Sequence, residues 1–116
     1  YNRGDELLEA AKFQQAAEQY RRALELDPEN GRLHYNLSQA LRGLGDYEGQ
    51  KRELESAIQI DSNLAPAYYS LAQLYVKQGS VAQAKQALKT ALAISPQFAE
   101  AQQALSSLDG DRERSE

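Results

Sequence analysis

The fold is decided by residues 69–96, which read YSLAQLYVKQGSVAQAKQALKTALAISP. The same pattern stands 34 residues earlier, where residues 35–62 read YNLSQALRGLGDYEGQKRELESAIQIDS. Two sets of residues keep this spacing along the chain: Leu37, Leu71 and Leu105, and Ala23, Ala57 and Ala91. Self-similarity at a fixed period is typical of a solenoid, in which each unit packs only against its neighbours. The period therefore predicts an array of repeats, and a binding role for the surface that such an array presents.

Within one unit the apolar residues are spaced as on a helix. Leu37, Leu41 and Leu44 lie on one face, and a second apolar stripe begins after Gly45-Asp46. Each unit is thus predicted to be a pair of helices joined by a tight turn. The expected helices cover about residues 2–10, 13–26, 31–44, 47–60, 65–78, 81–94 and 98–108.

Several short runs carry a family resemblance. Tyr35-Asn36-Leu37-Ser38, followed by Gly45-Asp46-Tyr47 and Ser56-Ala57-Ile58, resembles the tetratricopeptide repeat, and residues 69–96 are more similar still. The resemblance implies an all-α fold, a right-handed superhelical solenoid of antiparallel helix pairs with about three repeats and a C-terminal partial helix. The units are expected at about residues 1–30, 31–64 and 65–98, with a partial unit at 99–108 and a solvated tail at 109–116.

Composition limits the possible functions. The chain has 116 residues, of which 41% are hydrophobic and 26% charged, with a net charge of −4 and no cysteine. These values predict one soluble domain without disulfides or cysteine-bound zinc. Scattered basic residues argue against nucleic-acid binding, and the lack of a long apolar stretch argues against membrane insertion by this chain. Because the sequence has no Met and begins within an expected helix, we expect a fragment of a longer protein.

Residues that could carry chemistry are few. His34 is the only histidine, and it lacks the partners that a catalytic triad or a metal site would need, so a packing and capping role is expected. Gly43, Gly45 and Gly49 are spaced somewhat like a phosphate loop, but helices flank them, and Gly45 is predicted to be a turn residue with positive φ. The sequence therefore predicts no enzyme activity, no catalytic or metal-binding residues and no cofactor.

A row of aromatic and polar residues follows the period on the first helix of each unit. Tyr35 and Tyr69 begin this row, on the helix face opposite Leu37 and Leu41. In the tetratricopeptide family that face lines a concave groove, so the resemblance implies a partner-binding row of Tyr35, Asn36, Gln39, Arg42, Tyr69, Ser70, Gln73, Asn2 and Asp5. Amide side chains can pair with any peptide backbone, and tyrosines add rigid apolar area. The alternative is that the row reflects the family average and no ligand.

The row also indicates what kind of partner to expect. Chaperone-binding members of the family clamp two carboxylates with Lys and Arg in these positions, and only Asn36 matches that pattern. An acidic C-terminal tail is therefore disfavoured as a ligand. The row is more similar to the asparagine ladder of peptide-binding repeats attached to a glycosyltransferase, although Ser70 interrupts it.

The predicted function is a protein-interaction scaffold that binds an extended segment or helix of a protein partner. One alternative is a structural spacer, or a self-association element acting through the solenoid ends near Tyr1 and Leu105. A second alternative is an accessory domain that recruits or regulates an enzyme. The Ala- and Gln-rich composition is similar in style to tetratricopeptide segments of bacterial envelope assemblies, such as exopolysaccharide export or pilus secretion proteins, which suggests the periplasm or the cytoplasm.

The middle unit departs from its neighbours at one position. Gln50 stands where the other units have Ala16 and Ala84, at the tight crossing of the two helices. Two interpretations are open: the Gln side chain extends outward from a loose hairpin, or the position is a contact site or hinge. Replacing Gln50 with Ala is expected to stabilise the domain.

Overall fold

The computed structural model describes the backbone of residues 2–115 and the side chains of residues 10–110. Over this range the chain forms six helices and no strand. They are α1 (Asn2–Leu26), α2 (Gly31–Gly43), α3 (Tyr47–Ile60), α4 (Ala65–Lys77), α5 (Val81–Ile94) and α6 (Ala99–Ser115). The all-α fold is as predicted.

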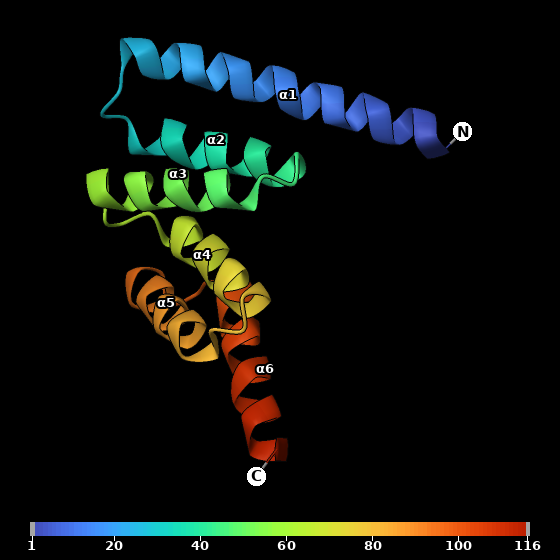
Figure 1. Ribbon diagram of the computed structural model, residues 1–116. Helices are drawn as coiled ribbons and strands as arrows, with labels where there is room; N and C mark the ends of the chain where they lie inside the picture. Colours follow the sequence, from blue (N-terminus) through green and yellow to red (C-terminus); the bar gives the residue numbers. More distant parts are fainter. Residues whose placement is uncertain (1, 116) are drawn as a thin grey trace. The chain divides into compact units, whose positions relative to one another are not determined.

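The chain divides into two compact units, residues 1–62 and 63–116. The first unit contains α1, α2 and α3, which run in alternating directions, with α2 in contact with both neighbours (Figure 1). Its core between α1 and α2 is formed by Ala17, Leu37, Ala40 and Leu41. The second unit contains α4, α5 and α6, and its core gathers small residues of all three helices around Leu88. Small side chains such as alanine let the helix axes approach closely.

Both hairpins turn in the same way, because each has glycine where the backbone needs positive φ. Gly45 and Gly79 both have φ of 79°. At the first turn the amide of Asp46 donates to Leu41 O (2.9 Å), and at the second the amide of Ser80 donates to Tyr75 O (2.8 Å). These bonds close Schellman motifs, which satisfy the last carbonyls of a helix. The prediction for Gly45 is confirmed.

The expected break within the first helix is wrong, because α1 is continuous over 25 residues. Ala11 stands in the register of Gly45 and Gly79. Alanine favours the helix and cannot adopt positive φ without strain, so the turn does not form. The expected helices at 2–10 and 13–26 are therefore one helix.

The last helix also runs further than expected. We predicted an end near residue 108 and an irregular tail, whereas α6 continues to Ser115. Glu113 stands in the turn register of Gly79, and glutamate and the neighbouring Arg112 and Arg114 favour the helix. The side chains beyond residue 110 lie outside the described residues, so the expected solvation of the tail stays a prediction.

Gln50 does not extend to solvent. Its side chain is only 2% exposed, although the neighbouring turn is open to solvent. Its Oε1 has no hydrogen-bond partner among the residues that the structure describes. The interpretation of an outward-reaching Gln50 is therefore wrong, because the α2–α3 packing encloses the amide.

Candidate functional site

A cavity of about 200 Å³ lies in the second unit, among α4, α5 and α6. Its lining residues are Tyr69, Ala72, Gln73 and Val76 of α4, Leu88 of α5, and Ala104, Ser107 and Leu108 of α6. None of these side chains carries a charge, and the surface that lines the cavity is almost entirely apolar. Val76 is 44% exposed and Ser107 is also exposed, so the cavity opens to solvent.

Helical periodicity brings these side chains together. Tyr69, Gln73 and Val76 follow the i, i+4, i+7 spacing that places residues on one face of α4. Ala104, Ser107 and Leu108 form the matching stripe on α6. Leu88, which is almost fully buried, contributes to the wall from α5.

Two contacts at the beginning of α6 hold this arrangement. The Tyr69 and Phe98 rings pack with centroids 5.3 Å apart and an interplanar angle of 44°, which is within the range of favourable aromatic pairs. Gln102 Nε2 donates a hydrogen bond to Pro96 O (2.6 Å) and ties the first turn of α6 to the preceding loop. The position of the Tyr69 ring is thus set by packing between α4 and the residues that lead into α6.

The predicted row is found in two separate places. In the second unit, Tyr69 and Gln73 line the cavity together, whereas Ser70 is 3% exposed and is not among the lining residues. In the first unit, Tyr35, Asn36 and Gln39 are half-buried on α2, and Arg42 near its end is exposed. Asn2 and Asp5 belong to the first turns of α1, whose side chains lie outside the described residues.

Sequence reasoning missed the residues of α5 and α6 that complete the cavity. Ala104, Ser107 and Leu108 have the i, i+3, i+4 spacing of a helix face and could have been found from that signal. In the sequence, Leu88 cannot be told apart from any other apolar core residue of α5. Only the packing of three helices shows that it borders a cavity.

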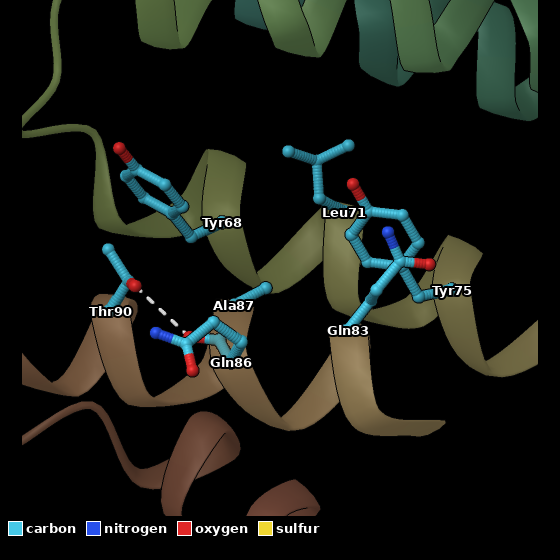
Figure 2. A pocket seen from close by; sticks show the side chains of 7 residues that line it. All are labelled: Tyr68, Leu71, Tyr75, Gln83, Gln86, Ala87 and Thr90. Atoms are coloured by element: carbon cyan, nitrogen blue, oxygen red, sulfur yellow. Dashed lines mark hydrogen bonds between the residues drawn. The ribbon is translucent and has the colours of Figure 1, made fainter. Parts of the chain in front are cut away.

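A second hollow lies on another side of α4 (Figure 2). It has a volume of about 250 Å³ and is lined by Tyr68, Leu71, Tyr75, Gln83, Gln86, Ala87 and Thr90. Figure 2 shows Tyr68 and Tyr75 of α4 on either side of Leu71, with Gln83, Gln86 and Thr90 on α5. Thr90 Oγ1 donates to the backbone carbonyl of Gln86 (3.0 Å), a bond within α5. Because Leu71 and Ala87 are buried, this hollow offers a ligand less apolar surface than its lining suggests.

His34 has a structural environment in the first unit. Its Nδ1 lies 2.7 Å from Glu53 Oε1, and its Nε2 lies 3.0 Å from Pro28 O. The ring therefore joins the α1–α2 loop, α2 and α3, and both of its nitrogens are occupied by protein atoms. These contacts support the packing and capping role expected for His34. Among the described residues, no group of three or more His, Cys, Asp or Glu side chains is placed to hold a metal ion.

No helix in the described part of the chain combines the length and the apolar character needed to cross a membrane.

Solved structures share this fold. The chain is similar to a crystal structure of MamA (TM-score 0.78, 24% identity), over 86% of this chain and 58% of that one. It is similar to the Yersinia enterocolitica type III secretion translocator chaperone SycD (TM-score 0.80, 17% identity), over 91% of this chain and 78% of that one. It is also similar to the second TPR domain of human RPAP3, solved in complex with the HSP70 peptide SGPTIEEVD (TM-score 0.76, 26% identity), over 93% of this chain and 90% of that one.

The chain thus spans 58% and 52% of the two MamA chains that it matches. No curated protein matches it. Two family models, both described as tetratricopeptide repeat, match residues 1–65 and residues 45–108. Together with the paired helices and the glycine turns, these matches show that the chain belongs to the tetratricopeptide repeat family.

Proposed function

We propose that this chain is a protein-interaction module in which the α4–α6 cavity and the residues around it bind a segment of a partner protein. The observation that carries the proposal is the meeting of Tyr69 and Gln73 in one solvent-open, largely apolar cavity. Sites of this kind combine apolar walls with a few polar groups that orient the ligand. The tyrosine supplies rigid contact area, and the Gln73 amide can both donate to and accept from a peptide backbone.

Membership of the tetratricopeptide repeat family supports the proposal at a coarse level. The second TPR domain of human RPAP3, which is 26% identical over 93% of this chain, was solved with a bound peptide. A fold shared with peptide-binding domains does not by itself assign a ligand. The finer expectation of a bacterial envelope or export assembly stays a prediction.

The α2 row, Tyr35, Asn36, Gln39 and Arg42, is a second proposed contact surface, within the first unit. Tyr35 and Gln39 have the same residue types as Tyr69 and Gln73 of α4, whereas Asn36 stands where α4 has Ser70. Arg42 adds an exposed cation. A partner segment that contacts this row would meet the Tyr35 ring and the amide groups of Asn36 and Gln39.

The proposal can be tested with a peptide library displayed on phage and selected on the purified chain. Selected peptides are synthesised, and their dissociation constants are measured by calorimetry with the parent and with Gln73→Ala. We expect Gln73→Ala to weaken binding about 5-fold or more, because it removes a polar contact at the mouth of the cavity. Gln103→Ala is the matched control, since Gln103 is exposed on α6 and does not line the cavity.

If Gln73→Ala and Gln103→Ala lower the affinity for the selected peptides equally, the peptides bind elsewhere on the chain and the proposal is contradicted. A selection that yields no peptide, together with concentration-dependent dimerisation in sedimentation experiments, would favour the self-association element. Circular dichroism of both variants confirms that the helices are intact.

A further inference from the structure

The cavity between α4 and α6 is electrically neutral along its entire lining. Its eight residues include no acid and no base. Helix α4 carries a single charged residue, Lys77, at its C-terminal end. A carboxylate that entered this cavity would lose its water without gaining an opposite charge, which is strongly unfavourable.

One ammonium group close to the lining, that of Lys85, is paired with a carboxylate. Lys85 precedes Leu88 by one helical turn, and Asp109 follows Leu108, so both residues border the lining. Lys85 Nζ lies 2.8 Å from Asp109 Oδ1. An acidic ligand group would have to displace Asp109, whose own negative charge opposes its approach.

The cavity has the size of one apolar side chain. Its volume is about 200 Å³, and an apolar cavity of about 150 Å³ in a protein is large enough to hold benzene. The exposed residues Val76 and Ser107 mark where a side chain could enter from solvent.

From this complementarity of charge and size, we infer that the cavity anchors one uncharged aliphatic or aromatic side chain of the partner segment and rejects carboxylates. The inference rests on the proposed interaction function and specifies the chemistry of its ligand. It separates this chain from a domain that recognises an acidic peptide end, because such a site needs cations and the lining of this cavity has none.

Two blocked amino acids serve as probes, N-acetyl-leucine methylamide and N-acetyl-aspartate methylamide. Each is titrated into the full 116-residue chain, labelled with nitrogen-15, and followed by the amide NMR signals. We expect the leucine probe to shift signals of the lining residues on α4 and α6 in a saturable way. Its dissociation constant should be at least about 10-fold lower than that of the aspartate probe, the ratio expected for burying one aliphatic side chain.

Adjacent serines on α6 provide matched variants. Ser106 and Ser107 are both exposed, but only Ser107 lines the cavity. Ser107→Leu should fill the mouth of the cavity and weaken binding of the leucine probe about 10-fold. Ser106→Leu adds the same side chain one position away and should leave the dissociation constant within about 2-fold of the parent value.

The inference is overturned if neither probe gives saturable shifts, if the aspartate probe binds as tightly as the leucine probe, or if Ser107→Leu has no more effect than Ser106→Leu. In each of these cases the proposed interaction function survives, provided that the library-selected peptides still depend on Gln73. If the binding of those peptides does not depend on Gln73, that result contradicts the proposed function, whatever the probe titrations show.

Discussion

The α2–α3 hairpin of the first unit and the α4–α5 hairpin of the second follow one sequence pattern but distribute their polar groups differently. Each turns through a glycine with φ of 79°. At the helix crossing, the first hairpin encloses Gln50, which is 2% exposed, whereas the second has Ala84 at 0%. The same backbone therefore accommodates a buried amide in one copy and a methyl group in the other.

The two hairpins also differ at the N-termini of their helices, where the first hairpin has the more favourable hydrogen bonds. In the first hairpin, Asn30 Oδ1 accepts from the Leu33 amide (3.1 Å) and Asp46 Oδ1 accepts from the Gly49 amide (3.0 Å). The corresponding N-cap residues of the second hairpin, Leu64 and Ser80, make no side-chain cap bond. The first hairpin thus combines favourable caps with an unsatisfied amide oxygen, and the second has neither.

The two hairpins also differ in their number of charged residues. Helix α3 alone carries Glu48, Lys51, Arg52, Glu53 and Glu55. The second hairpin has three charged residues, Lys77, Lys85 and Lys89. None of these three lysines lines the cavity, so the second hairpin borders an apolar cavity without placing a charge in its wall.

The largest expected effect comes from transferring the buried amide to the second hairpin. Ala84→Gln should lower the free energy of unfolding by about 3 kcal/mol, because a fully enclosed site must accept extra volume and an unpaired polar group. Urea denaturation gives the magnitude, and amide hydrogen exchange shows where protection is lost. We expect the loss in α4 and α5. An equal loss in α2 and α3 would mean that the two units unfold together.

The next largest effect concerns binding by the first unit. Tyr35→Ala combined with Asn36→Ala should weaken the binding of a library-selected peptide that contacts the α2 row by about 2 kcal/mol, as for an aromatic hot spot. Calorimetry measures the change, and circular dichroism confirms the helicity. Glu25→Ala combined with Lys89→Ala, at exposed positions on α1 and α5, is the control. Loss of binding in this control pair alone would contradict a role for the α2 row.

A third variant repairs the first hairpin. Gln50→Met should raise the free energy of unfolding by about 1 kcal/mol, because it removes the unsatisfied oxygen and keeps a long side chain in the enclosed space. Gln50→Ala also removes the oxygen but leaves a cavity, so it should be less stable than Gln50→Met. Thermal and urea denaturation of the two variants decide the order. A decrease for Gln50→Met would show that the amide makes a stabilising bond, for instance to a buried water molecule.

The smallest effects come from the caps. Asp46→Ala should lower the free energy of unfolding by about 1 kcal/mol, since it removes the acceptor for the Gly49 amide. Ser80→Ala, at the same place in the second hairpin, should change it by less than about 0.5 kcal/mol because no cap bond is lost. If the two variants lower the free energy of unfolding by comparable amounts, Ser80 caps α5 in solution.

Local signals in the sequence predicted most of the helices but misplaced two helix ends. Where glycine occupies the turn register, at Gly45 and Gly79, the hairpin forms as expected. Where Ala11 and Glu113 occupy it, the helix continues. Periodicity shows that positions correspond, while the backbone conformation depends on the residue present, because positive φ is accessible to glycine at little cost.

The sequence by itself determined the repeat, the paired helices, the family and the shared face of Tyr69 and Gln73, because these follow from spacing along a helix. Only the tertiary structure decided that Gln50 is enclosed, that Ser70 is buried beside the row, and that α5 and α6 complete a cavity. The physical reason is that burial and cavity shape arise where separate helices meet, and the packed volume between them is a property of all their side chains together.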